Sequence, residues 1–525
     1  MRSFLGQGKT IQVGLTVCFL MAFVLFGYDQ GLDQFNHPSD TKTGIIVSCY
    51  NLGCFAGCLG TLNILWSRLR LIRAILVLTL LFNYVVGEKL GRRRTIWLAM
   101  VFVIVGATLQ TSAFTVPHLV VGRIITGVGT GIKTSTVPMY QSELCDQRSR
   151  GRLVSAEVLF VGVGIVIAYW FDFGMSYVGG TIAWRLPIAA QIVFALIVVI
   201  LVMGLPESPR WLYKHGKHEE AMDVLCRVYD KESSDAYILA ERDAINSALE
   251  LESGSAEAKS LLSLFRTDRV KTRYRVILAW WVMFMNQAGG INLVVYYAPS
   301  ALVQNVGMSA RLAQILAGFI NLMFALGSIV PTLALDRMGR RRTMMWGCTG
   351  LSISMLMIAV LLSRSHSPNG QACAVGAISF FFVYMFIFDM TANCVPWVYV
   401  PEILPLQART HGSAIGVSSN WLWNFTVVMI TPVLINRLHW KAYVVFMATN
   451  AAFVPAFYFF FPETSNLRLE EIDIIFTRPG NPVRNARDMA KEMKLFGHIS
   501  EDTAGEFEPA PMIEKHESDE LCEHA

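Results

Sequence analysis

The stretch Val276–Ala298, VILAWWVMFMNQAGGINLVVYYA, decides the fold. It has 23 residues and no charge, and a helix needs about 20 apolar residues to cross a bilayer. Asn286, Gln287 and Asn292 interrupt it, with the glycine pair 289–290 between them. Amides are costly in hydrocarbon unless they are hydrogen-bonded, and paired glycines loosen a helix. We therefore expect a membrane helix whose amides bind an uncharged, hydroxyl-rich solute. Helix–helix packing by the same residues is the alternative.

The composition indicates a polytopic membrane protein. The chain of 525 residues is 54% hydrophobic and only 16% charged, against about 25% charged in an average protein. The net charge of +5 comes from short basic clusters between apolar runs, so it does not indicate nucleic-acid binding. The ten cysteines lie mostly inside apolar runs without zinc spacing, and we interpret them as small apolar residues.

Twelve membrane spans are predicted, which makes the fold class all-α with two six-helix bundles. The expected spans are 11–32, 43–65, 95–114, 118–137, 153–173, 182–205, 276–298, 311–335, 343–363, 372–400, 411–435 and 441–461. We expect residues 1–205 and 276–461 to form the bundles, 206–275 a central cytoplasmic loop, and 462–525 a polar tail.

Basic residues in the short loops predict the orientation. GEKLGRRR, DQRSRGR and DRMGRRR follow spans 2, 4 and 8, whereas the loops on the other side carry no Lys or Arg before Arg311. Because short cytoplasmic loops are rich in Lys and Arg, both termini and the central loop should be cytoplasmic. We expect the plasma membrane, a monomer, and the lipid bilayer as the surrounding partner.

Three motifs occur twice, in the same order. Glu88-Lys-Leu-Gly-Arg matches Asp336-Arg-Met-Gly-Arg, Tyr140-x-x-Glu143 matches Tyr399-x-x-Glu402, and Pro206-Glu matches Pro462-Glu. Their offsets of 248, 259 and 256 residues indicate two halves of similar structure. Such repeats are typical of transporters whose binding site lies between the halves.

The charged residues of these motifs are predicted to form ion pairs that latch one half against the other. Arginines that merely fix the topology are the alternative. The latch residues are Glu88, Arg92, Arg93, Glu143, Arg150, Asp336, Arg340, Arg341, Glu402 and Arg409.

These motifs make the chain resemble the sugar porters of the major facilitator superfamily, over residues 11–480. Further matching strings are Gly27-Tyr-Asp-Gln-Gly31, Pro206-Glu-Ser-Pro-Arg-Trp-Leu212, Gln287-x-x-Gly-Ile-Asn292, Pro396-Trp397 and Asn420-Trp-x-x-Asn424. The amino-acid sequence of the last third is similar to the fungal branch of the family, which includes symporters of hexoses, disaccharides and glycerol.

The resemblance implies which residues bind the substrate. Gln287, Asn286, Asn292, Asn321 and Asn424 would hydrogen-bond hydroxyl groups. Trp397 would supply an aromatic wall, Asn393 would line the cavity, and Tyr296 and Tyr297 would help to close the outer gate.

Proton coupling is implied for Asp29 in span 1 with Arg123 in span 4. An acid inside a membrane span is costly unless it is paired, and its environment can make it take and release a proton. The alternative is a static ion pair in a facilitative carrier. Glu157 and Asp389 are further acids inside spans.

One position departs from the family. Many members carry a substrate-binding Gln where alignment on Gly164 places Val158 here. This departure argues against a hexose-type contact at that position. Glu157 next to it is expected either to accept a hydroxyl or to pair with a basic neighbour.

Two segments differ in length from the family. We interpret residues 61–81 as a translated intron or gene-model error, with an interfacial helix that places Arg68, Arg70 and Arg73 against acidic lipid as the alternative. The link after Gly31 is also short, which would leave Asp29 near the outer surface.

The sequence thus predicts a twelve-helix carrier that imports a sugar or polyol with a proton and needs no other cofactor. No nucleophile–base pair, metal motif or nucleotide motif was found, so an enzyme is not expected. A facilitative uniporter and a non-transporting nutrient sensor are the alternatives.

Overall fold

A computed structural model gives the architecture of the chain. It describes residues 9–30, 40–60, 90–144, 150–253, 268–295, 302–303, 308–364, 368, 370–405, 408–465, 467 and 469–503. The segment 61–81, the link after Gly31, Glu88, Tyr296 and Tyr297 lie outside these residues. For Asp29, Arg150 and Asp336 only the backbone is described.

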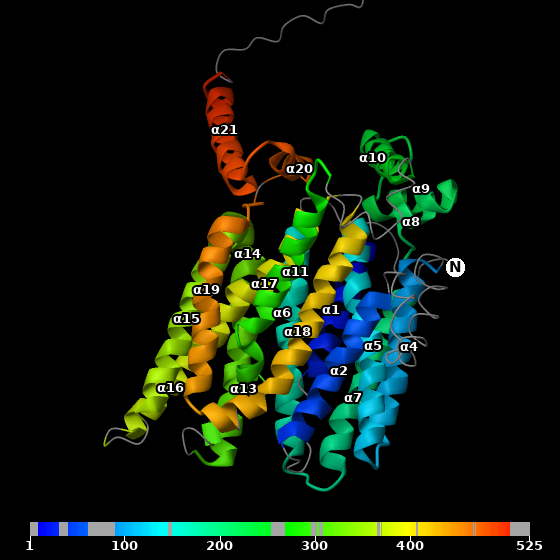
Figure 1. The fold of residues 1–525 in the computed structure, drawn as a ribbon. Helices are drawn as coiled ribbons and strands as arrows, with labels where there is room; N and C mark the ends of the chain where they lie inside the picture. The colour runs from blue at the N-terminus through cyan, green and yellow to red at the C-terminus, as the bar shows by residue number, and fades with distance from the viewer. Residues whose placement is uncertain are drawn as a thin grey trace, which may run out of the picture.

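Long helices run side by side through the body of the molecule (Figure 1). The first half contains α1 (Lys9–Gln30), α2 (Asp40–Gly60), α4 (Gly91–Thr111), α5 (Val116–Leu144), α6 (Arg150–Met175) and α7 (Ile182–Met203). The second half contains α11 (Thr272–Ala288), α13 (Ala310–Gly327), α14 (Ile329–Met338), α15 (Arg340–Ser363), α16 (Gly370–Phe388), the π-helix η3 (Asp389–Asn393), α17 (Cys394–Ile403), α18 (Arg409–Leu438) and α19 (Lys441–Phe460).

Twelve spans result from these helices, because α13 with α14, and α16 with η3 and α17, each continue as one span. Eight spans in the described part of the chain are by themselves long and apolar enough to cross a membrane. The expected all-α fold with two six-helix bundles is therefore confirmed.

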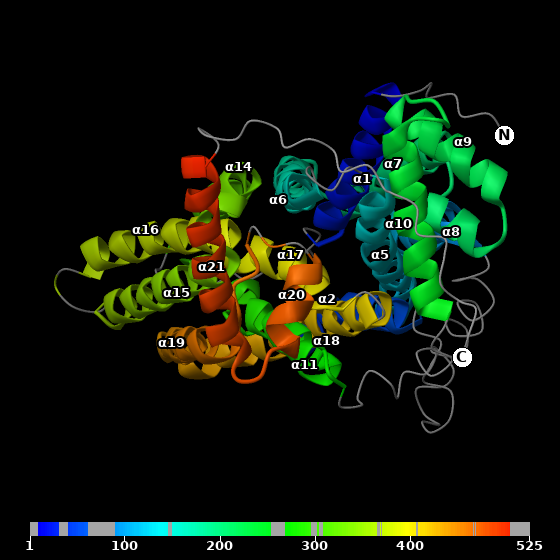
Figure 2. The ribbon, with the colours of Figure 1, turned by 90° about the horizontal axis from the view of Figure 1, so that it is seen from above.

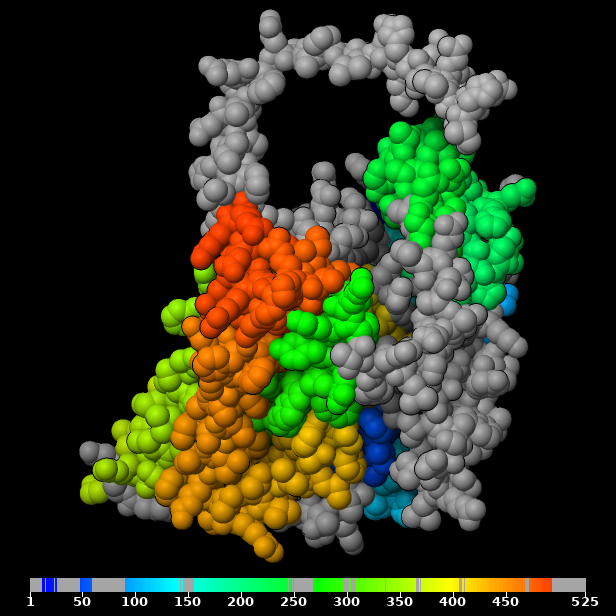
Figure 3. Space-filling view, turned by 45° about the horizontal axis from the view of Figure 1, so that its top comes forward, coloured from blue at the N-terminus to red at the C-terminus, as the bar shows by residue number. Residues whose placement is uncertain are grey.

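Further helices cover one end of the bundle, which we call the capped end. They are α8 (Pro209–Lys214), α9 (His218–Tyr229), α10 (Ala236–Ser253), α20 (Leu469–Thr477) and α21 (Pro482–Thr503). Viewed from above, α8–α10 lie over the first half, and α20 and α21 lie over the second (Figure 2). The space-filling view shows α20 and α21 resting on the end of α19, well separated from α10 (Figure 3).

The two halves meet along two seams. In one seam α2 packs against α18, and in the other α6 packs against α13 and α14. Polar contacts cross both seams, including Asn51 Nδ2 to Asn424 Oδ1 at 2.8 Å and Tyr169 Oη to the Gln314 carbonyl at 2.8 Å. The helices that border the seams are therefore the ones that can enclose a site between the halves.

Glycines set the close approach of α2 and α5. A Cβ placed on Gly53 would lie 2.3 Å from the Ile124 carbonyl oxygen, and one placed on Gly131 would lie 2.2 Å from the Cys54 carbonyl oxygen. Membrane helices gain little from hydrophobic burial against each other, so small residues that allow backbone contact stabilise their packing.

We expect Gly131→Ala to destabilise the first half, because its methyl group has no space at this crossing. Overpacking of this kind costs about 1–3 kcal/mol. The measurement is the apparent unfolding temperature of the purified protein in detergent. Gly174→Ala in α6 is the matched control, since a Cβ there would meet nothing within 4 Å. Equal stability of the two variants would contradict the tight α2–α5 crossing.

Candidate substrate-binding site

The central stretch of the sequence forms a broken helix. Helix α11 ends at Ala288, Gly290 has a φ of +98°, and helical structure resumes at Ile291–Val295. Neighbouring side chains bind the carbonyl groups that the break exposes, as membrane burial requires. Tyr384 Oη donates to the Gly289 carbonyl at 3.0 Å, and Asn450 Nδ2 donates to the same oxygen at 2.8 Å. The predicted loosening by the glycine pair is confirmed.

Side-chain amides form a connected network around this break. Gln287 is its centre, because Nε2 donates to Asn286 Oδ1 and to Asn420 Oδ1, each at 2.7 Å. Its Oε1 accepts from Asn292 Nδ2 at 2.9 Å. Asn286 Nδ2 in turn donates to the Ala392 carbonyl at 2.8 Å, which links α11 to the π-helix η3. The amide side chains are buried, and these bonds supply their hydrogen-bond partners and hold them in fixed orientations.

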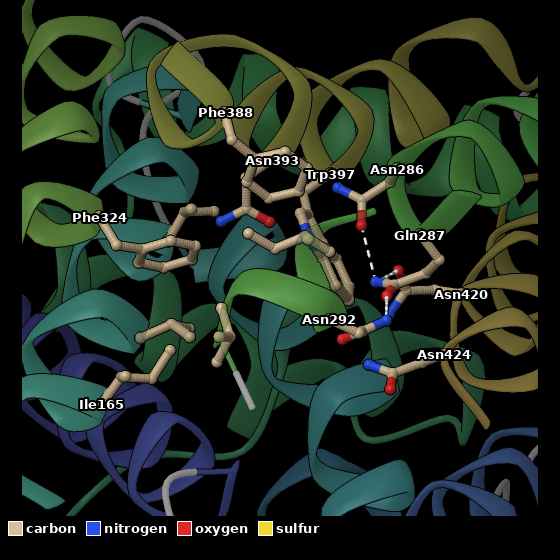
Figure 4. Close-up of a pocket in the computed structure, with 14 residues that line it drawn as sticks. Ile165, Asn286, Gln287, Asn292, Phe324, Phe388, Asn393, Trp397, Asn420 and Asn424 are labelled. Carbon is tan, nitrogen blue, oxygen red and sulfur yellow. Dashed lines mark hydrogen bonds between the residues drawn. The ribbon is translucent and has the colours of Figure 1, made fainter. Parts of the chain in front are cut away.

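The amides lie along one side of a cavity between the halves (Figure 4). The cavity holds about 590 Å³ of empty space, with the solvent at its mouth included. The described residues that line it are Val158, Val161, Ile165, Asn286, Gln287, Ile291, Asn292, Val295, Phe324, Phe388, Asn393, Trp397, Asn420 and Asn424. Six of these carry an amide and none carries a charge.

Most of the residues predicted to bind substrate are brought together here. Gln287, Asn286, Asn292 and Asn424 line the cavity, as do Asn393 and Trp397. These six residues therefore share one cavity, and their roles in binding substrate stay predictions. Val158, which replaces the family's Gln, also lines the cavity.

The structure does not bring Asn321 to the cavity with the other predicted residues. Its side chain is 2% exposed and is absent from the described cavity lining, and its Oδ1 has no hydrogen-bond partner among the described residues. Phe324, three residues further along α13, lines the cavity instead.

Sequence reasoning missed Asn420 and the phenylalanines Phe324 and Phe388. Asn420 precedes Asn424 by four residues on α18, and residues with this spacing share a helix face. That spacing within the quoted motif was a usable signal for Asn420. The phenylalanines gave no signal, because most of their neighbours in the sequence are apolar residues as well.

The charged motifs of the first half form one cluster at the capped end. Arg92 Nη2 lies 3.2 Å from Glu143 Oε1. Glu207 Oε1 accepts from the backbone N–H groups of Arg92 at 2.8 Å and Arg93 at 3.2 Å, where it caps the start of α4. Burial raises the pKa of Glu207, and these backbone donors oppose the shift. Tyr140 donates its hydroxyl to the Pro206 carbonyl.

The second half repeats this cluster with equivalent residues. Arg340 Nη2 lies 2.8 Å from Glu402 Oε1, and Glu463 accepts from the backbone N–H groups of Arg340 at 2.7 Å and Arg341 at 3.1 Å. Tyr399 Oη donates to the Pro462 carbonyl at 3.0 Å. The repeated motifs therefore have the same structural role in both halves.

This arrangement corrects the predicted latch. Arg92 with Glu143, and Arg340 with Glu402, are ion pairs as expected, but each pair lies inside one half. These pairs connect helices of the same half, because the arginine at the start of the third span of each half reaches the acid at the end of the fourth span. Arg93 and Arg341 donate to carbonyl groups of Met203 and Tyr458 in their own halves.

Arg409 is a further predicted latch residue. Arg409 donates to the Leu404 carbonyl at 3.4 Å, within its own half. Glu88 and the side chains of Arg150 and Asp336 are outside the described structure.

The acids inside the membrane differ in their surroundings. The side chain of Asp29 is not described, and Arg123 is 7% exposed. Glu157 is buried beside the cavity wall without lining it, and its Oε1 has no partner among the described residues. Asp389 is fully buried and accepts a hydrogen bond from Asn393, a cavity residue, at 2.5 Å. Among the acids inside the membrane whose side chains are described, Asp389 is therefore the one that is hydrogen-bonded to a cavity residue.

Two helical bundles with an amide-lined cavity between them define a membrane transporter. The comparisons with known proteins identify its family. Residues 70–476 match the family described as sugar (and other) transporter. The chain belongs to this family, within the sugar porters of the major facilitator superfamily, and is a transporter rather than an enzyme.

Curated relatives and a solved structure agree with this assignment. Sugar transporter STL1 of Saccharomyces cerevisiae is 34% identical over 499 residues, covering 90% of this chain and 82% of that protein. MFS-type transporter oryC of Aspergillus oryzae is 36% identical over 481 residues, covering 89% and 85%. The proton:xylose symporter XylE of E. coli, bound to 6-bromo-6-deoxy-D-glucose, has the same fold, with a TM-score of 0.72 at 22% identity and coverage of 89% and 100%.

Proposed function

We propose that this transporter carries an uncharged polyhydroxy solute, a sugar or polyol, by alternating access. The observation that carries the proposal is the cavity lining, in which six of the fourteen described residues are amides and none is charged. Each amide offers both donors and an acceptor, which matches hydroxyl groups. A charged substrate would lose its hydration without a counter-ion from the described lining, which is costly.

The position of the cavity supports alternating access. Its lining comes from α6 of the first half and, in the second half, from α11, the helical turn Ile291–Val295, α13, α16, η3, α17 and α18. A rocking movement of one half against the other would expose such a cavity to each side of the membrane in turn. Trp397 offers an aromatic surface on which the C–H face of a sugar can stack.

Proton coupling is our proposal for the energy source, with Asp29 and Arg123 as the coupling pair. The family resemblance supports this assignment, and the structure adds Asp389 as a buried acid bonded to a cavity residue. No cofactor other than the proton is needed. A facilitative uniporter is the alternative.

We place the transporter in the plasma membrane as a monomer, with the capped end in the cytoplasm. The basic clusters support this orientation, because Arg92–Arg94 and Arg340–Arg342 begin α4 and α15 at the capped end. Short basic loops stay on the cytoplasmic side.

Uptake measurements in a yeast strain without its own sugar and glycerol transporters test the proposal. The chain should import at least one radiolabelled member of a panel of glycerol, pentoses, hexoses and disaccharides. Addition of a protonophore should abolish accumulation, and Asp29→Asn should do the same. If neither the protonophore nor Asp29→Asn changed transport, the result would favour the uniporter. A protein that reaches the membrane and transports no member would favour the sensor.

A further inference from the structure

The wall that the first half contributes to the cavity is entirely apolar in the described structure. It consists of Val158, Val161 and Ile165 on α6. Their spacing of three and four residues places them on one stripe of the helix. Their side chains are 3%, 6% and 2% exposed, so the surface that they present is almost completely buried inside the molecule.

Two aromatic rings of the second half continue this wall. Phe324 and Phe388 line the cavity, and their rings are stacked with centroids 6.3 Å apart. Figure 4 shows Ile165 and Phe324 on one side of the cavity, opposite Asn292 and Asn424. Asn393 is the one described amide that reaches toward the apolar side, and its Nδ2 already donates to Asp389.

The cavity therefore has two unlike sides, and a bound ligand contacts both. A hydroxyl group turned toward Val158 or Ile165 would leave water without gaining a hydrogen bond, which is unfavourable. A methylene or methyl group in the same place would gain apolar contact instead. A ligand with hydroxyl groups all around it would place at least one of them against this apolar wall.

We propose that the site selects polyhydroxy compounds that carry hydroxyl groups along one edge and an apolar edge toward α6. The chemical class is deoxy or alkyl-bearing sugars and polyols, in preference to the parent compounds hydroxylated all round. Val158, Val161 and Ile165 are then the residues that determine specificity. This inference rests on the proposed function, because it assigns the chemistry of the same site.

Matched ligand pairs test the preference directly. The probes are D-glucose with its 1-, 2-, 3- and 6-deoxy forms, D-galactose with D-fucose, and glycerol with 1,2-propanediol. Binding to the purified full-length protein can be followed by tryptophan fluorescence, because Trp397 lines the cavity. At least one deoxy compound should bind about tenfold more tightly than its parent, within the range by which apolar pockets discriminate an added hydroxyl.

Val158→Gln should reverse this preference, because its amide supplies partners for a hydroxyl on the α6 side. Val158→Leu is the matched control, since it changes the side-chain volume without adding a polar group, and it should keep the wild-type order. Val161→Thr provides a second polar variant of nearly unchanged shape, in case Val158→Gln does not fold.

The outcomes separate this inference from the proposed function. If none of the probes binds, the proposed function fails and this inference fails with it. If the parent compounds bind as tightly as the deoxy forms, and the polar variants leave the order unchanged, the proposed function stands and the apolar-edge preference is overturned.

Discussion

Replacement of Gln287 by leucine should reduce transport about a hundredfold without unfolding the protein. Gln287 makes three hydrogen bonds, to Asn286, Asn420 and Asn292. Without them the neighbouring amides lose their fixed orientation, and the site also loses the amide of Gln287. If this weakens substrate binding by two to three hydrogen bonds of about 1 kcal/mol each, the effect is a factor of about 100. Leucine is similar in size, so the backbone of α11 should remain in place. Initial uptake rates, normalised to protein at the cell surface, provide the measurement.

Gln191→Leu in α7 is the control for this variant. Gln191 is also a buried amide in a membrane helix, with 2% exposure, but it does not line the cavity. Its variant should transport at close to the wild-type rate. If both leucine variants transported equally well, the amide network would be helix packing rather than a binding site, which was the alternative interpretation of the central stretch.

Replacement of Ser155 by cysteine should make transport sensitive to oxidation. Ser155 on α6 and the native Cys394 on α17 belong to different halves, and Cys394 Sγ lies 3.5 Å from Ser155 Oγ. A cysteine at position 155 therefore has its sulfur close enough to Cys394 for a disulfide after small adjustments. A covalent bond between the halves would prevent the rocking that alternating access requires, so oxidation should reduce uptake more than about tenfold.

A reductant should restore uptake by Ser155→Cys, because it breaks the disulfide without other changes. Both side chains are buried, so the oxidant has to be membrane-permeable. The double variant Ser155→Cys/Cys394→Ser keeps one thiol and should be insensitive to oxidation. Full uptake by a protein shown to carry the cross-link would contradict movement between α6 and α17.

Much of the fold was predictable, because hydrophobic length and charge placement are local properties of the sequence. Uncharged runs of about 20 residues predict membrane helices wherever they occur. The repeated Gly-Arg-Arg, Tyr-x-x-Glu and Pro-Glu strings indicated two equivalent halves, and the structure gives each string the same contacts in both halves. The broken helix at Gly289 and Gly290 followed from the same kind of local reasoning.

The partners of the charged and polar residues were less predictable. The sequence indicated that Arg92 and Arg340 pair with acids, but not that each pair stays inside one half. Likewise, the sequence did not distinguish Asn321 from Asn424, whereas the structure places Asn424 and Phe324, but not Asn321, in the cavity lining. Such outcomes depend on how helices far apart in the chain are rotated against each other.

The sequence by itself thus determined the number of helices, the two-half organisation and the amide-rich character of the site. Tertiary structure decided which amides share one cavity, that α6 closes it with valine and isoleucine, and that the ion pairs brace each half separately. The physical reason is that hydropathy and backbone preferences act within a segment, whereas hydrogen-bond and packing partners are chosen by helix rotation and crossing in three dimensions.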